Sequence, residues 1–187
     1  MIRSKIIGTG SYLPDRVISN REAGAALKID PDTITRLTGI EERRWADPAQ
    51  ASSDLAVEAA RAALNAAGLE PTAMEAILVS TTSPDMPFPS TACHVQRKLT
   101  CGSVPAFDVA ASCSGFLYGL SMADAMIRSG QIKTCLVAAA EVKSRTLDPH
   151  DLDTALLFGD GAGAVIVQGE QEQLFWIKFD SANGRRY

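Results

Sequence analysis

The sequence has few of the residues on which metal sites and disulfide frameworks depend. It contains two histidines, His94 and His150, and four cysteines, none of them in a Cys-x-x-Cys pair. Zinc sites need clustered His and Cys ligands, so we expect no metal to be bound. The cysteines, at positions 93, 101, 113 and 135, are expected to be free thiols, because disulfides rarely persist in a reducing cytosol.

Long apolar runs and an excess of positive charge are also absent. No stretch approaches the roughly 20 apolar residues of a membrane-spanning helix, and no signal-peptide pattern opens the chain. The 18 Lys and Arg residues face 22 Asp and Glu residues, so the net charge is −4 and no basic face is available for nucleic acid. We therefore expect a cytoplasmic protein that binds neither a membrane nor nucleic acid.

What the sequence does contain is an ordinary globular composition in which strand and helix patterns alternate. With 187 residues, 46% of them hydrophobic, the chain can bury a core. The patterns predict strands over 2–8, 76–80, 104–109, 135–140, 164–168 and 174–179, the last two pairing antiparallel. They predict helices over 91–99 and 114–128, a helix that Ser53 or Asp54 caps and Gly68 ends, and short helices opening at Ser19 and Asp30. The run 43–45 indicates a solvated turn. This alternation predicts an α/β domain with a mixed sheet covered by helices.

One cysteine occupies an unusual place in this pattern. In "DVAASCSGFLYGL", Cys113 follows a predicted strand and precedes a predicted helix, and its neighbours are small. Unpaired N–H groups and the positive end of the helix dipole favour a thiolate at such a position. The spacing alone leaves two interpretations open: a reactive nucleophile, or a buried cysteine with no chemical role.

Five segments carry a resemblance to a known family. "IIGTGSYLP" (6–14), "TGIEERR" (38–44), "FPSTAC" (88–93), "VPAFDVAA" (104–111) and "FGDGAGA" (158–164) occur in the order found in β-ketoacyl-(acyl carrier protein) synthase III, and "AFDVAASCSGFLYGL" resembles its active-site segment. The likeness covers nearly the whole chain. It implies a thiolase-like α/β fold, of which this chain is one half of a duplicated arrangement.

The resemblance also implies an activity and roles for particular residues. Cys113 would accept an acyl group from an acyl-CoA or acyl carrier protein thioester, and condensation with malonyl-carrier protein would follow without a cofactor. The N–H of Cys113 would help to stabilise the oxyanion. Phe158 would border the acyl pocket, and Phe88 resembles a residue that the family sends across its dimer interface. Asp108 and Asp160 are expected to be structural.

The chain departs from the family pattern in two ways. The family also uses a histidine and an asparagine in the second half of its fold, and neither His94, His150 nor Asn183 matches those positions. We therefore expect residues 1–187 to be the N-terminal half of such an enzyme. The C-terminal half would be absent from this chain, either because the chain is a fragment or because that half is a separate polypeptide. The expected partners are an acyl carrier protein, the missing half and a second copy of the chain.

The second departure concerns coenzyme A. Typical members hold its adenine between a tryptophan and an arginine, at positions that correspond to Thr33 and Leu152 here. Leu37 stands where a further coenzyme A-contacting arginine is usual, although the adjacent Arg36 could serve. The loss of a stacked aromatic and a cation weakens the case for acetyl-CoA as primer and favours a carrier-bound or unusual primer.

Two other functions stay open on the residues alone. The chain could be a non-catalytic half-fold that binds an acyl carrier protein or a partner subunit, since the histidine and asparagine are missing. A cysteine hydrolase is less favoured, because no histidine lies in a pattern typical of a nucleophile–base pair.

Overall fold

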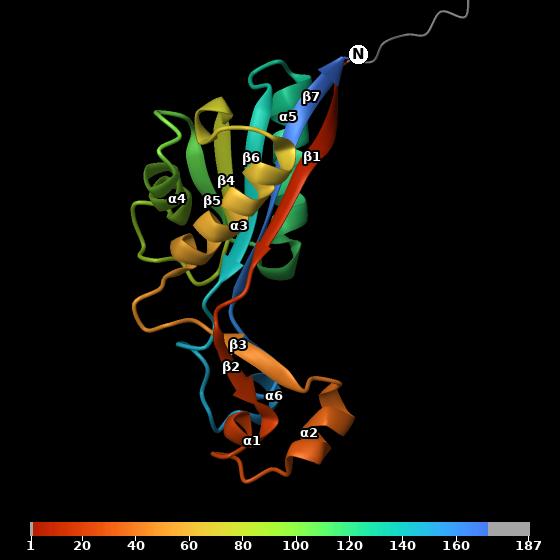
Figure 1. The fold of residues 1–187 in the computed structure, drawn as a ribbon, viewed down its shortest axis with the longest axis vertical. Coiled ribbons are helices and arrows are strands. Elements are labelled where there is room, and N and C mark those ends of the chain that lie inside the picture. The colour runs from red at the N-terminus through yellow and green to blue at the C-terminus, as the bar shows by residue number, and fades with distance from the viewer. Residues whose placement is uncertain (1, 172–187) are drawn as a thin grey trace, which may run out of the picture.

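The computed structural model describes residues 2–171, which form a five-stranded mixed sheet and a smaller group of elements at one end of it (Figure 1). The strand order is β1-β7-β6-β4-β5. Strands β4, β5 and β6 run parallel, whereas β7 is antiparallel to both β6 and β1. Their bounds are β1 Ile2–Tyr12, β4 Ala76–Ser80, β5 Ala106–Val109, β6 Thr134–Glu141 and β7 Gly161–Gln171. The α/β fold class with a mixed sheet is confirmed.

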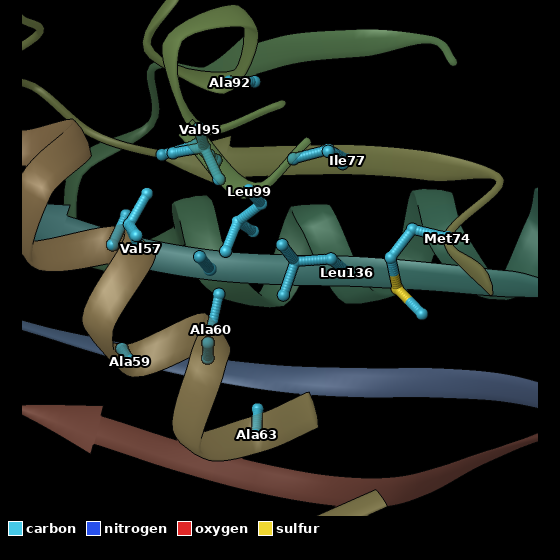
Figure 2. Packing of buried hydrophobic residues seen from close by; sticks show 14 of the residues in the cluster. Val57, Ala59, Ala60, Ala63, Met74, Ile77, Ala92, Val95, Leu99 and Leu136 are labelled. Atoms are coloured by element: carbon cyan, nitrogen blue, oxygen red, sulfur yellow. The ribbon is translucent and has the colours of Figure 1, made fainter. Parts of the chain in front are cut away.

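Helices cover both faces of this sheet. Helices α3 (Ser52–Ala67) and α4 (Thr91–Leu99) lie on one face, and α5 (Gly115–Arg128) lies on the other (Figure 1). Within β4, Ile77 and Val79 belong to the cluster under α3 and α4, as Figure 2 shows for Ile77, whereas Leu78 packs in the cluster under α5. Burial on both faces explains why β4 is apolar throughout, and the predicted bounds 76–80 are confirmed.

Strand β1 extends to Tyr12, beyond the predicted bounds 2–8. The prediction was too short because glycines interrupt the apolar pattern of this strand. A Cβ at Gly10 would lie 2.2 Å from the Ala59 carbonyl oxygen, and one at Gly8 would lie 2.3 Å from that of Ala63. The glycines therefore allow the backbone of α3 to approach β1 closely. The strand pairs with β7 as far as Tyr12, which lies opposite Ala162.

The smaller group of elements lies beyond the carboxyl ends of the parallel strands (Figure 1). It consists of the antiparallel pair β2 (Arg16–Ser19) and β3 (Glu42–Trp45) with the helices α1 (Asn20–Ala23), α2 (Pro31–Thr38) and α6 (Leu152–Ala155). The 3-10 turns η1 (Pro71–Ala73) and η2 (Ser112–Ser114) complete the described elements.

The expected solvated turn over 43–45 is wrong. These residues lie in β3, and Arg43 is only 6% exposed. Its guanidinium donates to Asn20 Oδ1 at 2.9 Å and to the Leu156 carbonyl oxygen at 2.8 Å, and burial lowers its pKa. The contact with Leu156 spans 113 positions of sequence, so local composition could not predict it.

Helix boundaries were predicted well except at two starts. Ser19 Oγ accepts the Glu22 N–H, and Asp30 and Gly39 delimit α2 as expected. The cap of α3 was wrongly predicted: Ala51 is the N-cap, Asp54 accepts its N–H at 2.9 Å, and Ser53 is bound by another carboxylate. Helix α5 begins one residue after the predicted start. The predicted strand 164–168 lies within β7, whereas the predicted strand 174–179 lies outside the described residues.

Candidate active site

Cys113 lies where β5 leads into α5. After β5 the chain passes two alanines and enters the turn η2, which ends where α5 begins. Ser112 adopts a φ of 49°, a left-handed conformation that is uncommon for a residue other than glycine. The junction therefore holds Cys113 in a strained turn rather than in regular helix.

The Cys113 side chain is exposed, which contradicts the alternative of a buried cysteine. The face of α5 that packs on the sheet carries Gly115, Gly119, Ala123 and Ile127. Among the described residues 2–171, nothing covers the other face: Leu117 is 64% exposed, and Tyr118 and Met122 are also exposed. Phe116 and Leu120 are half-buried and pack against the cluster between α5 and the sheet.

A glycine at the first position of α5 sets the height of this turn above the sheet. A Cβ on Gly115 would lie 2.2 Å from Ser80 Oγ and 3.2 Å from the Val109 carbonyl oxygen. A Cβ here would displace Ser80 Oγ and press against Ser80 Cβ and the Val109 carbonyl oxygen, so glycine favours this close approach of the helix start to β4 and β5. The thiol is thereby placed beside the carboxyl ends of the parallel strands.

A pocket of about 490 Å³ opens next to the thiol. It lies where β4 and β6 end and β7 begins, which is the edge where α/β sheets usually bind ligands. Its walls are mainly apolar, and they include Cys113, Leu13, Phe116, Phe158 and Ala139. This volume suits a small acyl group or a similar ligand.

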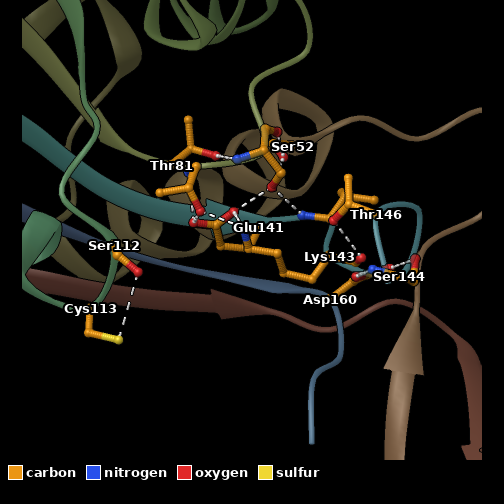
Figure 3. A network of polar contacts seen from close by, with 12 residues as sticks. Ser52, Thr81, Ser112, Cys113, Glu141, Lys143, Ser144, Thr146 and Asp160 are labelled. Carbon is orange, nitrogen blue, oxygen red and sulfur yellow. Dashed lines mark hydrogen bonds and ion pairs between the residues drawn. The ribbon is translucent and has the colours of Figure 1, made fainter. Parts of the chain in front are cut away.

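The polar wall of the pocket centres on Glu141, the last residue of β6 (Figure 3). Its Oε1 accepts the Thr82 N–H at 2.8 Å and the Thr82 hydroxyl at 2.9 Å, and its Oε2 accepts the Ser83 hydroxyl. Lys143 Nζ lies 3.6 Å from Oε2 and also donates to Thr82 Oγ1. Thr82, Glu141 and Lys143 all line the pocket together with Cys113.

The structure brings together two of the four predicted site residues. Cys113 and Phe158 line the same pocket. Phe88 is 83% exposed in the loop between β4 and α4, and Arg36 is exposed on α2; neither lines the pocket. The roles of Phe88 and Arg36 stay predictions.

Sequence reasoning missed the polar residues of the pocket. Thr82, Glu141 and Lys143 come at or just after the ends of two apolar strands, and this position was the available signal. The carboxyl ends of parallel neighbouring strands meet at one edge, so polar residues that follow them gather there. The register of β4 against β6, which places Ser80 opposite Ala139, brings the two loops together.

The two predicted structural aspartates have the expected role. Asp108 accepts the N–H groups of Thr91 and Ala92, at 2.7 and 2.8 Å, at the start of α4. Asp160 accepts the N–H groups of Ala46 and Ser144, at 2.7 and 2.8 Å, and so joins three loops near the pocket.

The other cysteines and the two histidines lie outside the pocket. Cys101 and Cys135 are buried, and burial raises their pKa to about 11 and about 12. Cys93 Sγ contacts the Ala106 carbonyl oxygen at 3.5 Å. Neither His94, on α4, nor His150, before α6, lines the pocket, so no histidine of residues 2–171 lies there with Cys113.

The described residues hold neither a cluster of metal ligands nor a membrane-spanning helix. Within residues 2–171, no three His, Cys, Asp or Glu side chains are grouped so that they could hold a metal ion. In the same part of the chain, none of the helices combines the length and apolar character that crossing a membrane requires.

The comparisons with known proteins agree on one family. A model of the family described as 3-oxoacyl-[acyl-carrier-protein] synthase III matches residues 107–183. The β-ketoacyl-[acyl-carrier-protein] synthase III of Laribacter hongkongensis is 50% identical over 169 residues, which cover 90% of this chain and 53% of that protein. The corresponding protein of Ehrlichia canis is 46% identical and is covered over 54% of its length. The chain thus spans about half the length of these curated relatives.

Solved structures give the same result for the fold. The 3-oxoacyl-[acyl-carrier-protein] synthase III of Aquifex aeolicus superposes with a TM-score of 0.86 at 45% identity, covering 90% of this chain and 54% of that one. The priming β-ketosynthase of the R1128 polyketide pathway also gives a TM-score of 0.86, at 34% identity, covering 90% and 50%. In sequence and in its thiolase-like fold, this chain is similar to about half the length of these β-ketoacyl-[acyl-carrier-protein] synthase III proteins.

Proposed function

We propose that residues 1–187 form the N-terminal, acyl-accepting half of a β-ketoacyl-(acyl carrier protein) synthase III-type condensing enzyme of fatty acid or polyketide biosynthesis. The observation that carries this proposal is the exposed thiol of Cys113, held in a strained turn at the rim of an apolar pocket. The reaction is an acyl transfer followed by a carbon–carbon condensation.

In the first step the Cys113 thiolate attacks the carbonyl carbon of an acyl thioester. The tetrahedral intermediate collapses, the C–S bond to coenzyme A or carrier protein breaks, and that thiol leaves as its thiolate. In the second step malonyl-carrier protein loses CO₂, and the resulting carbanion attacks the Cys113 thioester. The new C–C bond forms as the Cys113 thiolate departs, so no redox cofactor or metal is needed.

The remaining predicted residues have supporting roles in this proposal. Phe158, which lines the pocket, borders the acyl chain. The largely exposed Phe88 reaches the pocket of a second copy in a homodimer, and Arg36, exposed on α2, contacts the coenzyme A or carrier arm that delivers the primer. The proposed location of the enzyme is the cytoplasm.

The remaining half of the enzyme would supply the histidine and asparagine and cover the open face of α5. Leu117, Tyr118 and Met122 form an exposed apolar strip on that face, and the chain spans only about half the length of its relatives. Both observations support a second domain of the duplicated fold as the occupant of this strip.

Acylation of Cys113 tests the proposal. The full-length protein is mixed with acyl-CoA or acyl carrier protein thioesters, and intact mass and peptide mapping follow the transfer. We expect one acyl group on Cys113, and we expect Cys113→Ser to lose most of it because a serine hydroxyl stays protonated. A protein that binds carrier protein but never becomes acylated would instead be a non-catalytic half-fold.

A further inference from the structure

Lys143 places a cation on the polar wall of a mainly apolar pocket. It is the only cation among the described residues that line the pocket, and its side chain is 27% exposed. We propose that Lys143 is a specificity-determining residue: it selects an acyl group that carries a neutral oxygen, such as a hydroxyacyl or ketoacyl group, over a plain alkyl chain. This inference rests on the proposed acylation of Cys113.

The hydrogen bonds of the polar wall leave Lys143 with a donor to spare. Glu141 accepts three bonds from neutral donors of Thr82 and Ser83 in addition to its ion pair with Lys143, so both carboxylate oxygens are already occupied. The lysine ammonium has three N–H donors. One bonds Thr82 Oγ1 and one is directed to Glu141, which leaves a third for a ligand.

Glu141 does not depend on Lys143 for its position. The Thr82 backbone N–H holds Oε1, and the Ser83 hydroxyl, which itself accepts the Val142 N–H at 2.9 Å, holds Oε2. A purely supporting role would therefore leave the lysine dispensable. Its presence at the pocket surface is better explained by contact with the occupant.

The charge of the wall points to a neutral oxygen rather than a carboxylate. Lys143 and Glu141 together carry no net charge, and a carboxylate ligand near the ammonium would also meet the Glu141 anion. A plain alkyl chain would bury an N–H donor without an acceptor, which is unfavourable. A hydroxyl or keto oxygen accepts from Lys143 without either penalty.

Competition between acyl donors tests this assignment in the full-length protein. Butyryl, 3-hydroxybutyryl, 4-hydroxybutyryl and succinyl thioesters of N-acetylcysteamine share one leaving group, so rate differences come from the acyl group. We expect a hydroxybutyryl group to be transferred to Cys113 about tenfold faster than butyryl, as one hydrogen bond to a charged donor allows. In Lys143→Met this preference should disappear, and Lys143→Arg should retain most of it.

Controls separate selectivity from a loss of folding or of function. Lys133→Met removes an exposed lysine outside the pocket and should leave the ratio unchanged; thermal unfolding reports whether each variant is folded. An equal ratio in wild type and Lys143→Met, or a preference for succinyl, overturns the neutral-oxygen assignment. If no donor acylates Cys113 in the wild type, the proposed function itself fails, and this inference fails with it.

Discussion

The four cysteine side chains share one chemistry but differ in their access to solvent. Cys113 is exposed, Cys93 is half-buried against a carbonyl oxygen, and Cys101 and Cys135 are buried. Burial disfavours the thiolate, which raises the pKa of Cys101 to about 11 and of Cys135 to about 12. Since the thiolate is the reactive species, these two thiols should be inert near neutral pH.

This difference predicts the order in which the thiols are alkylated. In folded protein at about pH 7.5, a brief exposure to iodoacetamide should label Cys113 first, because it is accessible and the buried thiols stay protonated. Labelling of Cys101 and Cys135 should rise only as the pH approaches their raised pKa values of about 11 and about 12. Peptide mass mapping gives the modified fraction of each cysteine.

Denaturation provides the control for this experiment. In urea the environments of the four thiols become alike, and all should be labelled at similar rates. Equal labelling in folded protein, or a preference for another cysteine, would contradict the assignment of Cys113 as nucleophile.

The start of helix α5 fixes the position of Cys113, because Gly115, the first residue of the helix, lies against the ends of β4 and β5. The Gly115 position leaves no space for a side chain next to Ser80 Oγ, and Cys113 is only two residues away. Any displacement of the helix start therefore moves the thiol relative to the pocket.

Gly115→Ala should reduce both stability and acylation. The added methyl group overpacks the contact between α5 and β4, which costs about 1–3 kcal/mol of unfolding free energy. The shifted thiol should be acylated about 10- to 100-fold more slowly, as small displacements of a reacting group allow. Urea unfolding and the rate of Cys113 acylation measure the two effects.

An exposed position supplies the matched control. Gln131→Ala changes an exposed side chain just beyond the end of the same helix and should leave both quantities nearly unchanged. Wild-type stability and rate in Gly115→Ala would show that the helix start is not held by this contact.

Within residues 2–171, the helix on one side of the sheet has an exposed apolar outer face. Helices α3 and α4 lie on one side of the sheet and α5 on the other (Figure 1). The outer face of α5 exposes Leu117, Tyr118 and Met122. Contiguous exposed apolar side chains of this kind mark surfaces that bind another protein element.

The 187-residue chain should therefore associate in solution when it is alone. Sedimentation velocity at micromolar concentration should show species larger than a monomer, because the apolar strip on α5 is otherwise in water. The double variant Leu117→Glu with Met122→Glu should shift the distribution toward monomer, since burying two carboxylates is unfavourable.

A charge-matched variant controls for net charge. Ser129→Glu with Gln131→Glu adds the same two charges just beyond the end of α5 and should leave association unchanged. A stable monomer for the wild-type chain would contradict the proposed docking of a second domain on this helix.

Local sequence signals predicted the elements whose causes are local. Proline and cap residues delimit α2, and the apolar run of β4 indicates a buried strand; both agree with the structure. The same signals placed Cys113 at a strand–helix junction, and family motifs along the chain identified it as a candidate nucleophile.

Contacts between distant segments explain what those signals missed. Arg43 is buried beside the Leu156 carbonyl oxygen, which lies 113 residues away and accepts its guanidinium N–H. Cys113 is exposed because no element within residues 2–171 covers the outer face of α5. The polar wall forms because parallel pairing aligns the ends of β4 and β6, which brings Thr82 to Glu141 and Lys143. A linear sequence specifies which residues can cap, pack or react, but the meeting of these side chains depends on strand register, which is set by packing of the whole sheet.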